Sequence, residues 1–570
     1  MPLAMPLPSP LLEPLAAAVD SAAQTDQAPS EVQGTVQGTV RKAFIGAIAG
    51  TLAALWALTA LLLPDTANAS HRSAQHQPEV AEKQAAQPKS REQLMQFSAD
   101  PLSGQQWWLA AAGGSNTQSL EARLRGVPGF IGAWRTAATT AATSSPASGG
   151  LAGPVVAVLD TGITPHPDLA GQVLPGYDFV SESLFANDGD GRDADAGDPG
   201  DWVSAADRLD PRMANCAEQR SSWHGTIIAG LIAAVPDNAQ GVAGINGRAR
   251  ILPVRVAGKC GAAVADIVDG LRWAAGLPVA GAPINPYPAR IVNISFGGAT
   301  ACSREYQAAI DELRSHNVVV VASAGNGSGA VARPANCQGV LGVAALNRDG
   351  FKAHYSNFGA ALASFGVATV GGDDAPQGAW RPWLSDGGLV TVWNNGTQQP
   401  GAAEYARLSG TSFAAPLVAG TLSLMLSVNP ALSAEQLLTG VRLTARAHVT
   451  SSLMPLCSAA DPGRCICSSR SCGAGILDAE QALRYAAYPE SYVAPVQQVA
   501  VLDTAELRQA LSSGPDWLAP APAPALTQAQ ANGQDTQSSA TGAPSGAGGG
   551  AMSWLWVLML GVSTLLLRLR

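Results

Sequence analysis

The sequence predicts an α/β fold built on a doubly wound parallel sheet that is flanked by helices. Three features of the middle of the chain indicate it: continuous apolar runs of strand length, glycine-containing turns after several of these runs, and apolar helix-compatible segments between them. Such alternation of strands and helices is typical of parallel sheets. The predicted strands with their following turns are residues 155–162, 249–256, 291–298 and 318–327, and the predicted helices are 224–234, 263–275, 413–425 and 473–483.

Composition favours one large domain of this kind, accompanied by flexible or membrane segments. The 570 residues include 61 glycines and 39 prolines, and only 14% of them are charged. The formal net charge is -9, and no basic cluster lies within the region of the predicted sheet. A nucleic-acid-binding protein would show a basic patch or stripe, so the sequence gives no sign of nucleic acid as a partner.

Ser412 lies where small, turn-forming residues give way to an apolar run that can form a buried helix. A helix that starts here points free backbone N–H groups and the positive end of its dipole at the serine. Pro416 fits the first turn of that helix, where its missing N–H would lack a partner in any case. A serine in such a place is commonly only a helix cap. To act as a nucleophile, it needs a base and a third group that orients the base.

Asp160 and His224 can supply those two groups. Asp160 ends a buried strand, and open α/β sheets place their sites at the carboxyl ends of their strands. His224 precedes two small residues and then an apolar run, so it opens a predicted helix much as Ser412 does. The three residues are therefore candidates for one site.

Three motifs around these residues resemble the subtilisin-like serine proteases, in the order Asp, His, Ser that this family uses. Each motif alone is weak, and together they are strong. The motifs are Asp-Thr-Gly-Ile and His-Pro-Asp-Leu within residues 160–169, His-Gly-Thr at 224–226, and Gly-Thr-Ser-x-Ala-Ala-Pro at 410–416.

The resemblance implies a serine endopeptidase that cleaves proteins through an acyl-enzyme and needs no organic cofactor. By this resemblance His224 takes the proton of Ser412, while Asp160 orients the imidazole and stabilises its protonated form. Phe413 and Leu417 depart from the common family pattern, but neither carries the chemistry. The alternative is a catalytically silent binding domain of the same fold at the cell surface.

Asn326 lies in Ala-Gly-Asn-Gly, a sequence that alone indicates an ordinary left-handed turn. The resemblance places it at the oxyanion hole, where its amide and the Ser412 N–H would stabilise the tetrahedral oxyanion. It also implies a pocket for the residue before the scissile bond, with small walls that favour a large apolar side chain. The residues implied to bind substrate are Ser295, Gly297 and Gly298 on one wall, and Ser323 and Gly325 on the other.

Six aspartates spaced by glycines lie between Asp160 and His224, and they would repel one another if nothing neutralised them. A hard cation such as Ca²⁺ would satisfy them, and a solvated acidic turn is the alternative. The spacing is not that of an EF-hand, because Gly191 is one place early and the final Glu is missing. The candidate ligands are Asp188, Asp190, Asp193, Asp195 and Asp198, with Asp201 as the sixth carboxylate. The resemblance suggests a second cation site at Asp168 and Asn238.

The eight cysteines follow a predicted export signal, and their even number favours disulfides formed in an oxidising compartment. The family resemblance implies the pairs Cys216–Cys260 and Cys302–Cys337. The remaining four allow three pairings, and the sequence does not choose among them. A zinc site is the alternative for these four, although their C-x-C spacing is unlike a usual zinc knuckle. They are Cys457, Cys465, Cys467 and Cys472.

Both ends of the chain carry membrane or sorting features. Arg41 and Lys42 precede the apolar run 43–63, and the small residues 67–69 complete a predicted export signal for signal peptidase. This run is also long enough, at about 20 residues, for an uncleaved anchor. At the other end, glycines, an apolar run at 554–567 and terminal arginines resemble the sorting signals that intramembrane proteases cut in Gram-negative bacteria. A plain membrane anchor is the alternative there.

These features predict an exported monomer, either secreted or held at the outer envelope, because positive residues stay on the cytoplasmic side. The predicted segments are a lead-in at 1–42, the signal or anchor at 43–69, a short pro-segment or linker at 70–97, the catalytic domain at 98–490, a flexible linker at 491–550 and the terminal membrane or sorting segment at 551–570.

Overall fold

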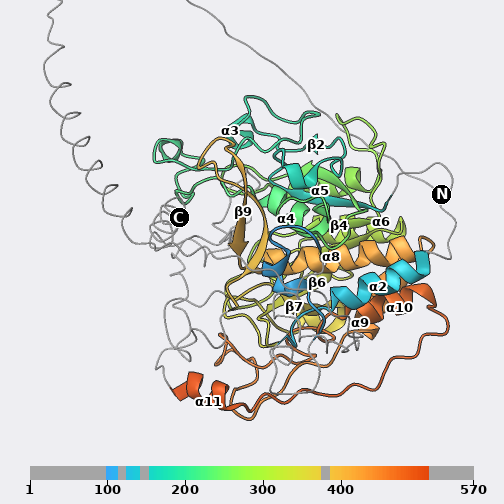
Figure 1. Cartoon of the computed structure of the whole chain (residues 1–570). Coiled ribbons are helices and arrows are strands. Elements are labelled where there is room, and N and C mark those ends of the chain that lie inside the picture. Colours follow the sequence, from blue (N-terminus) through green and yellow to red (C-terminus); the bar gives the residue numbers. More distant parts are fainter. Residues whose placement is uncertain (1–97, 113–123, 142–152, 374–385, 513–570) are drawn as a thin grey trace, which may run out of the picture. The chain divides into compact units, whose positions relative to one another are not determined.

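The computed structural model describes residues 98–112, 124–141, 153–373 and 386–512 (Figure 1). The predicted lead-in, export signal, pro-segment and C-terminal sorting segment all lie outside these residues, as does most of the predicted linker. Within the described residues, one helix is long and apolar enough to cross a membrane, namely α8 (Thr411–Val428). Most of that helix is buried inside the domain, as expected for a core helix.

A seven-stranded sheet forms the centre of the domain, in the order β2-β3-β1-β4-β5-β6-β7. Every neighbouring pair of its strands is parallel. The predicted doubly wound parallel sheet is therefore confirmed. The strands are β1 (Val155–Asp160), β2 (Tyr177–Asp178), β3 (Arg250–Arg255), β4 (Ile291–Ile294), β5 (Val319–Ser323), β6 (Leu341–Leu346) and β7 (Val367–Val370).

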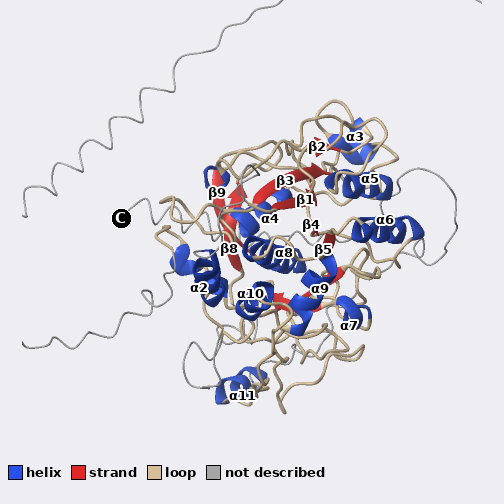
Figure 2. Cartoon of the chain, turned by 90° about the vertical axis from the view of Figure 1, so that its right-hand side faces the viewer, coloured by secondary structure: helices blue, strands red, loops and turns tan. Residues whose placement is uncertain are grey.

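Helices cover both faces of this sheet (Figure 2), so successive side chains of each strand enter two different cores. In β1, Val156 and Val158 pack on the side of α8, whereas Ala157 and Leu159 pack on the side of α5 and α6. Burial on both faces explains why the strands are continuous apolar runs and not alternating patterns.

The helices divide between these two layers and the edges of the domain. On the α8 side lie α2 (Phe130–Ala141), α4 (His224–Ala233), α9 (Ala434–Leu443) and α10 (Ala479–Ala487). On the opposite side lie α5 (Val264–Ala274) and α6 (Arg304–Ser315). The shorter helices are α3 (Ser183–Ala186), α7 (Ala361–Phe365) and α11 (Ala505–Ser512).

The position of β1 fixes where a site can form. The chain leaves β1 to build β2 and β3 on one side and then returns across it to build β4 and the later strands on the other. Connections that diverge in this way leave a crevice at the carboxyl ends of the central strands. Asp160 is the last residue of β1, and Ser295 directly follows β4.

The closing helix starts later than the sequence predicted. It was expected at 473–483, but α10 begins at Ala479, and the carboxylate of Asp478 caps it by accepting the Gln481 N–H at 2.9 Å. The preceding residues pair with β7 instead, through Ile476 in parallel with Ala368. A helix through the glycine-rich start of this segment would give up that pairing with the sheet.

A two-stranded antiparallel sheet was not predicted. It consists of β8 (Leu389–Asn394) and β9 (Ala403–Leu408), and β9 leads directly into the residues before Ser412. The loop at its tip reaches the segment before His224, because Trp223 Nε1 donates to Gly396 O at 2.7 Å. The hairpin therefore connects the two ends of the candidate site.

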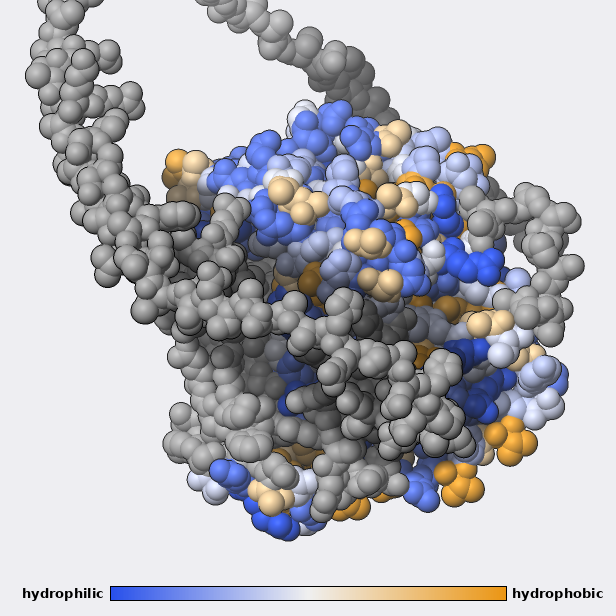
Figure 3. Space-filling model, in the orientation of Figure 1, coloured by the Kyte–Doolittle hydropathy of each residue, from blue (hydrophilic) through white to orange (hydrophobic). Residues whose placement is uncertain are grey.

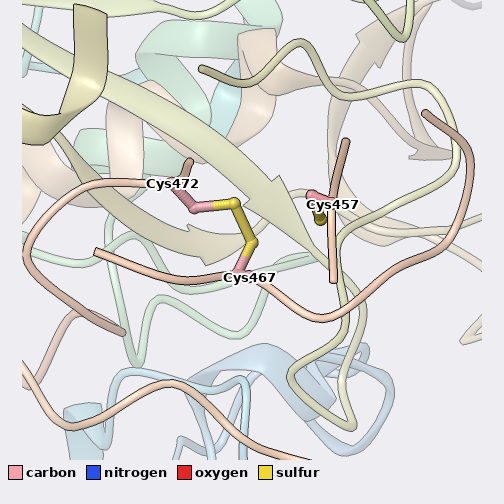
Figure 4. A group of neighbouring side chains, drawn as sticks. All are labelled: Cys457, Cys467 and Cys472. Atoms are coloured by element: carbon pink, nitrogen blue, oxygen red, sulfur yellow. A yellow bond between two sulfur atoms is a disulfide. The ribbon is translucent and has the colours of Figure 1, made fainter. Parts of the chain in front are cut away.

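All eight cysteines form disulfides. The expected pairs Cys216–Cys260 and Cys302–Cys337 are present, and the other four pair as Cys457–Cys465 and Cys467–Cys472. The sulfurs of Cys457, Cys467 and Cys472 lie within 4.8 Å of one another (Figure 4), so this group could resemble a metal site. Zinc binds cysteine as thiolate. Sulfurs that are joined in disulfides cannot serve this role, so the zinc alternative is wrong for this arrangement.

Candidate active site

The structure brings Asp160 and His224 into direct contact. His224 Nδ1 lies 2.8 Å from Asp160 Oδ1 and 2.9 Å from Oδ2, and the Thr161 N–H donates to the same carboxylate at 2.8 Å. Asp160 is 1% exposed and His224 is 8% exposed. Because a carboxylate only accepts hydrogen bonds, Nδ1 must carry a proton, which leaves Nε2 of the neutral ring as the acceptor.

This contact requires the start of α4 to approach the end of β1 very closely. A Cβ added to Gly225 would lie 2.1 Å from the Gly162 carbonyl oxygen, so only glycine fits after the histidine. Gly162 itself has φ 104°, a conformation that favours glycine. The Gly225 N–H also donates to Thr161 Oγ1 at 3.1 Å. The close approach of these two backbone segments thus explains why glycine follows both Asp160-Thr161 and His224.

Buried aspartates surround His224 and change its acidity. Burial by itself lowers the pKa of His224, but the nearby carboxylates of Asp160, Asp201 and Asp198 outweigh it and raise the pKa above its ordinary value. Burial also raises the pKa of Asp198 to about 7. Asp198 accepts from Thr161 Oγ1 at 2.7 Å, and Asp201 accepts from the Ser222 N–H at 2.6 Å.

Ser412 is the second residue of α8, so the predicted position at a loop-to-helix boundary is confirmed. Its Oγ donates to the Ser295 carbonyl at 2.7 Å, and Ser295 Oγ donates back to the Ser412 carbonyl at 2.8 Å. Ser412 is buried, and the ring of the next residue, Phe413, lies 6.0 Å from the His224 ring. The first turn of α8, which carries Ser412, thereby lies near the His224–Asp160 pair.

Pro416 is the sixth residue of α8, so the prediction that it lies in the first turn is wrong. An N–H at this position would have bonded to the Ser412 carbonyl, four residues earlier. Ser295 Oγ takes the place of that missing donor. The proline therefore frees a carbonyl that ties α8 to the residue after β4.

Asn326 lies in the loop after β5, and Thr411 fixes its orientation. Asn326 Oδ1 accepts from the Thr411 N–H at 2.9 Å and from Thr411 Oγ1 at 2.8 Å. The amide nitrogen therefore points away from Thr411, and it would lie 3.7 Å from a Cβ added to Gly410. Asn326 therefore lies beside the two residues that precede Ser412, and its role at the oxyanion hole stays a prediction.

Asn357 holds the loop that carries Asn326, a role that was not predicted from the sequence. Its Oδ1 accepts from the N–H groups of Gly327 and Gly329, both at 2.9 Å, and its Nδ2 donates to the Ala324 carbonyl at 3.0 Å. One side chain thus replaces three backbone partners on both sides of Asn326. No local pattern marks such a residue, because its partners lie about 30 positions away in the sequence.

The candidate substrate residues gather at the same end of the sheet. Gly298 exchanges two backbone hydrogen bonds with Arg333, at 3.1 and 2.9 Å. A Cβ added to Gly297 would lie 1.9 Å from the Arg333 carbonyl oxygen. Within the described part of the chain, the N–H and carbonyl of Gly297 have no hydrogen-bond partner, so they can pair with an extended peptide. Ser323 ends the neighbouring β5, and Gly325 follows it.

The aspartates of the acidic loop do not converge on one point. Asp193 accepts from the Asp195 N–H at 2.8 Å, Asp195 accepts from the Gly197 N–H at 2.9 Å, and Asp188 contacts Arg255. Among the described residues, the one group of three possible metal ligands consists of cysteines. The region over α3, next in the chain to this loop, is mostly hydrophilic (Figure 3). These contacts fit the alternative of an acidic turn, and a cation at Asp188, Asp190, Asp193, Asp195 or Asp198 stays a prediction.

The structure does bring the residues of the second predicted cation site together. Asp168 Oδ1 accepts from Asn238 Nδ2 at 2.9 Å, and its Oδ2 accepts from the Val242 N–H at 2.9 Å. Burial raises the pKa of Tyr405, and the carboxylates of Asp168 and Asp100 raise it further, so both acids lie near this ring. Asp100 is 1% exposed, and its Oδ1 has no hydrogen-bond partner among the described residues. A buried carboxylate oxygen without a partner fits a hard cation.

Comparison with known proteins agrees with this geometry. The family model described as the subtilase family matches residues 152–475, more than half of the 570-residue chain. The chain belongs to the subtilase family. The four candidate residues Asp160, His224, Asn326 and Ser412 all lie within the matched region.

Relatives of this subtilase include proteins named as proteases. An extracellular protease of Xanthomonas campestris is 42% identical over 334 residues, which are 58% of this chain and 51% of the relative. An extracellular basic protease of Dichelobacter nodosus is 39% identical over 280 residues, covering 48% and 43%. The solved structure of a protease from Pseudoalteromonas arctica aligns with a TM-score of 0.55 and 38% identity, covering 68% of this chain and 99% of that one. The chain spans about half the length of the two curated relatives.

Because the buried carboxylates of Asp160, Asp201 and Asp198 raise the pKa of His224, we expect the Asp201→Asn substitution to lower that pKa toward its ordinary value. Removing a negative charge takes away stabilisation of the protonated ring. The measurement is an NMR titration of the imidazole, made in a Ser412→Ala background and assigned with His224→Gln.

Asp190→Asn is the matched control, because Asp190 is an exposed carboxylate of the same acidic loop. It should leave the titration midpoint of His224 in place. An unchanged or higher midpoint in Asp201→Asn would show that Asp201 does not contribute to the field at His224.

Proposed function

We propose that this subtilase is a serine endopeptidase that hydrolyses peptide bonds of proteins through an acyl-enzyme on Ser412. The observation that carries the proposal is the buried contact between His224 Nδ1 and the Asp160 carboxylate, beside a serine in the first turn of α8. A buried imidazole whose pKa is raised by a carboxylate, next to a hydroxyl, is the arrangement that general-base activation of a nucleophile needs.

The first half of the reaction forms the acyl-enzyme. The Ser412 hydroxyl turns from the Ser295 carbonyl toward His224, and Nε2 takes its proton as Oγ bonds to the substrate carbonyl carbon. The carbonyl electron pair moves onto oxygen, where the Asn326 amide and the N-terminal N–H groups of α8 stabilise the negative charge. The protonated His224 then gives its proton to the leaving amine, and the C–N bond breaks.

The second half returns the enzyme to its starting state. Water gives a proton to His224 Nε2 while its oxygen attacks the acyl carbon, and the same donors stabilise the second oxyanion. As the bond from carbon to Oγ breaks, Ser412 regains the proton from His224. Throughout both halves the Asp160 carboxylate holds the ring orientation and stabilises the protonated ring, without taking the proton itself.

Substrate binding follows from the backbone of residues 295–298. An extended peptide pairs with the free N–H and carbonyl of Gly297, which holds its scissile bond beside Ser412. The side chain before that bond enters the space between this segment and residues 323–325. Because small residues form these walls, a large apolar side chain is preferred there.

The alternative is a catalytically silent surface-binding domain of the same fold. Such a domain has no need for the combination of Asp160, His224, Asn326 and Ser412, which the structure keeps in contact or close to one another. The names of the relatives also favour a protease, since both are described as extracellular proteases. Modification of the nucleophile separates the two functions.

Location and partners follow from the same names and from the predicted ends of the chain. The subtilase is exported and is secreted or held at the outer envelope, with signal peptidase and an intramembrane sorting protease as processing partners. Asp168 and Asp100 would hold Ca²⁺ beside Asn238, and the bound ion would neutralise these buried carboxylates, which bond to the 237–242 loop. The enzyme acts as a monomer on protein substrates.

A serine-directed fluorophosphonate should label the exported protein at Ser412, because His224 activates this hydroxyl. Intact mass spectrometry measures the added group and also shows which terminal segments have been removed. Ser412→Ala should take up no label. A folded, exported wild-type protein that stays unlabelled would favour the silent binding domain.

Asn357→Ala should lower kcat roughly 10- to 100-fold with little change in KM, because the loop loses the hydrogen bonds that aim Asn326 at the oxyanion. Steady-state kinetics on a peptide substrate measure both constants. Asn429→Ala is the control: Asn429 also bonds to backbone groups, but at the far end of α8. An equal loss of kcat in both variants would mean that Asn357 acts only through general stability.

Chelation of Ca²⁺ should lower the thermal unfolding midpoint, since a ligand at about 100 times its Kd stabilises the folded state by about 2.7 kcal/mol. Scanning calorimetry of the Ser412→Ala protein with EGTA, and then with added Ca²⁺ or Mg²⁺, measures the effect. Asp100→Asn should reduce the difference between the two conditions, whereas Asp190→Asn should not. Equal midpoints with and without Ca²⁺ would argue against a bound calcium ion.

A further inference from the structure

Arg333 places an unpaired positive charge beside the backbone that binds substrate. Its Nε and Nη2 atoms would lie 3.1 and 3.5 Å from a Cβ added to Gly298, and its guanidinium lies 5.8 Å from the centre of the Tyr306 ring. The side chain is half-buried. In the part of the chain that the structure describes, it forms no ion pair and no hydrogen bond, so its donors have no acidic partner there.

The place of this charge relative to the scissile bond follows from the strand geometry. Ser412 Oγ lies 2.7 Å from the Ser295 carbonyl, which puts the scissile bond next to Ser295. An extended segment rises about 3.3 Å per residue, so Gly298 lies about 10 Å further along. A peptide that pairs with Gly297 on the acyl side of the cleaved bond therefore brings its third and fourth residues before that bond, P3 and P4, nearest to Arg333.

Gly298 has no side chain, and a Cβ at this position would lie 3.1 Å from Nε of Arg333, so only glycine leaves the guanidinium open on this side of the segment. The backbone of Arg333 is fixed by its two hydrogen bonds to Gly298, which limits where its side chain can go. A guanidinium matches the geometry of a carboxylate, and charge-assisted hydrogen bonds are stronger than neutral ones. The chain as a whole has a formal net charge of -9, which by itself would repel an acidic substrate. The positive charge of Arg333 provides a local attraction for such a substrate.

We propose that Arg333 makes the enzyme select substrates that carry an acidic residue at P3 or P4. The inference rests on the proposed peptidase function and adds a second determinant to the apolar pocket for the residue before the scissile bond. The guanidinium binds the substrate carboxylate and takes no part in the chemical steps.

The test compares fluorogenic peptides that differ only by Glu, Gln or Lys at P2, P3 or P4, with a constant large apolar residue at P1. For the wild-type enzyme, kcat/KM should be about tenfold higher with Glu than with Gln at P3 or P4, which is the size expected of one charge-assisted hydrogen bond. Arg333→Met should remove this preference, and Arg333→Glu should replace it with a preference for Lys. Added salt should reduce the ratio.

Arg304→Met is the matched control, because it removes one exposed positive charge at the start of nearby α6. It should keep the preference for Glu. Equal rates with Glu and Gln at all three positions in the wild type, or a preference that persists in Arg333→Met, would overturn the assignment while leaving the peptidase function in place. Absence of both hydrolysis and Ser412 labelling would overturn the proposed function and this inference with it.

Discussion

The site depends on how closely the first turn of α4 approaches the turn after β1. Gly225 has space for no side chain against the Gly162 carbonyl, and Thr161 bonds to the Gly225 N–H from the other side. This approach holds the first residue of α4, His224, against the strand that ends in Asp160, so that their side chains meet at 2.8 Å. Any side chain at Gly225 would push the imidazole away from the carboxylate that fixes its tautomer.

The second fixed relation ties α8 to the end of β4. Ser295 and Ser412 exchange two hydrogen bonds, one of which exists because Pro416 has no N–H to offer the Ser412 carbonyl. Ser295, which starts the proposed substrate-binding segment, thus also holds Ser412, the proposed nucleophile. A peptide that pairs with Gly297 is therefore aligned with Ser412 through only the short backbone segment from Ser295 to Gly297. Motions elsewhere in the chain have little effect on this alignment.

Sequence patterns predicted those features that depend on local constraints. Burial on both faces makes the central strands continuously apolar, and the close approach of backbones requires glycine next to Asp160 and His224. Features that depend on distant partners left no such signal. Asn357 serves residues about 30 positions away, Arg255 neutralises carboxylates from another segment, and residues 473–477 leave a helical pattern to pair with β7. Metal ligands share this difficulty, since spacing along an acidic loop does not determine where its carboxylates point.

The acidic loop can act on His224 even without a metal ion. Ionised Asp198 favours the protonated ring, which cannot serve as a base, yet burial raises the pKa of Asp198 to about 7. As the pH falls toward that value, Asp198 becomes neutral and stops stabilising the imidazolium. The two titrations are therefore coupled, because protonation of Asp198 weakens the field that raises the pKa of His224. Neutralisation of Asp198 thus keeps more of the imidazole in its basic form than a permanently ionised carboxylate would allow.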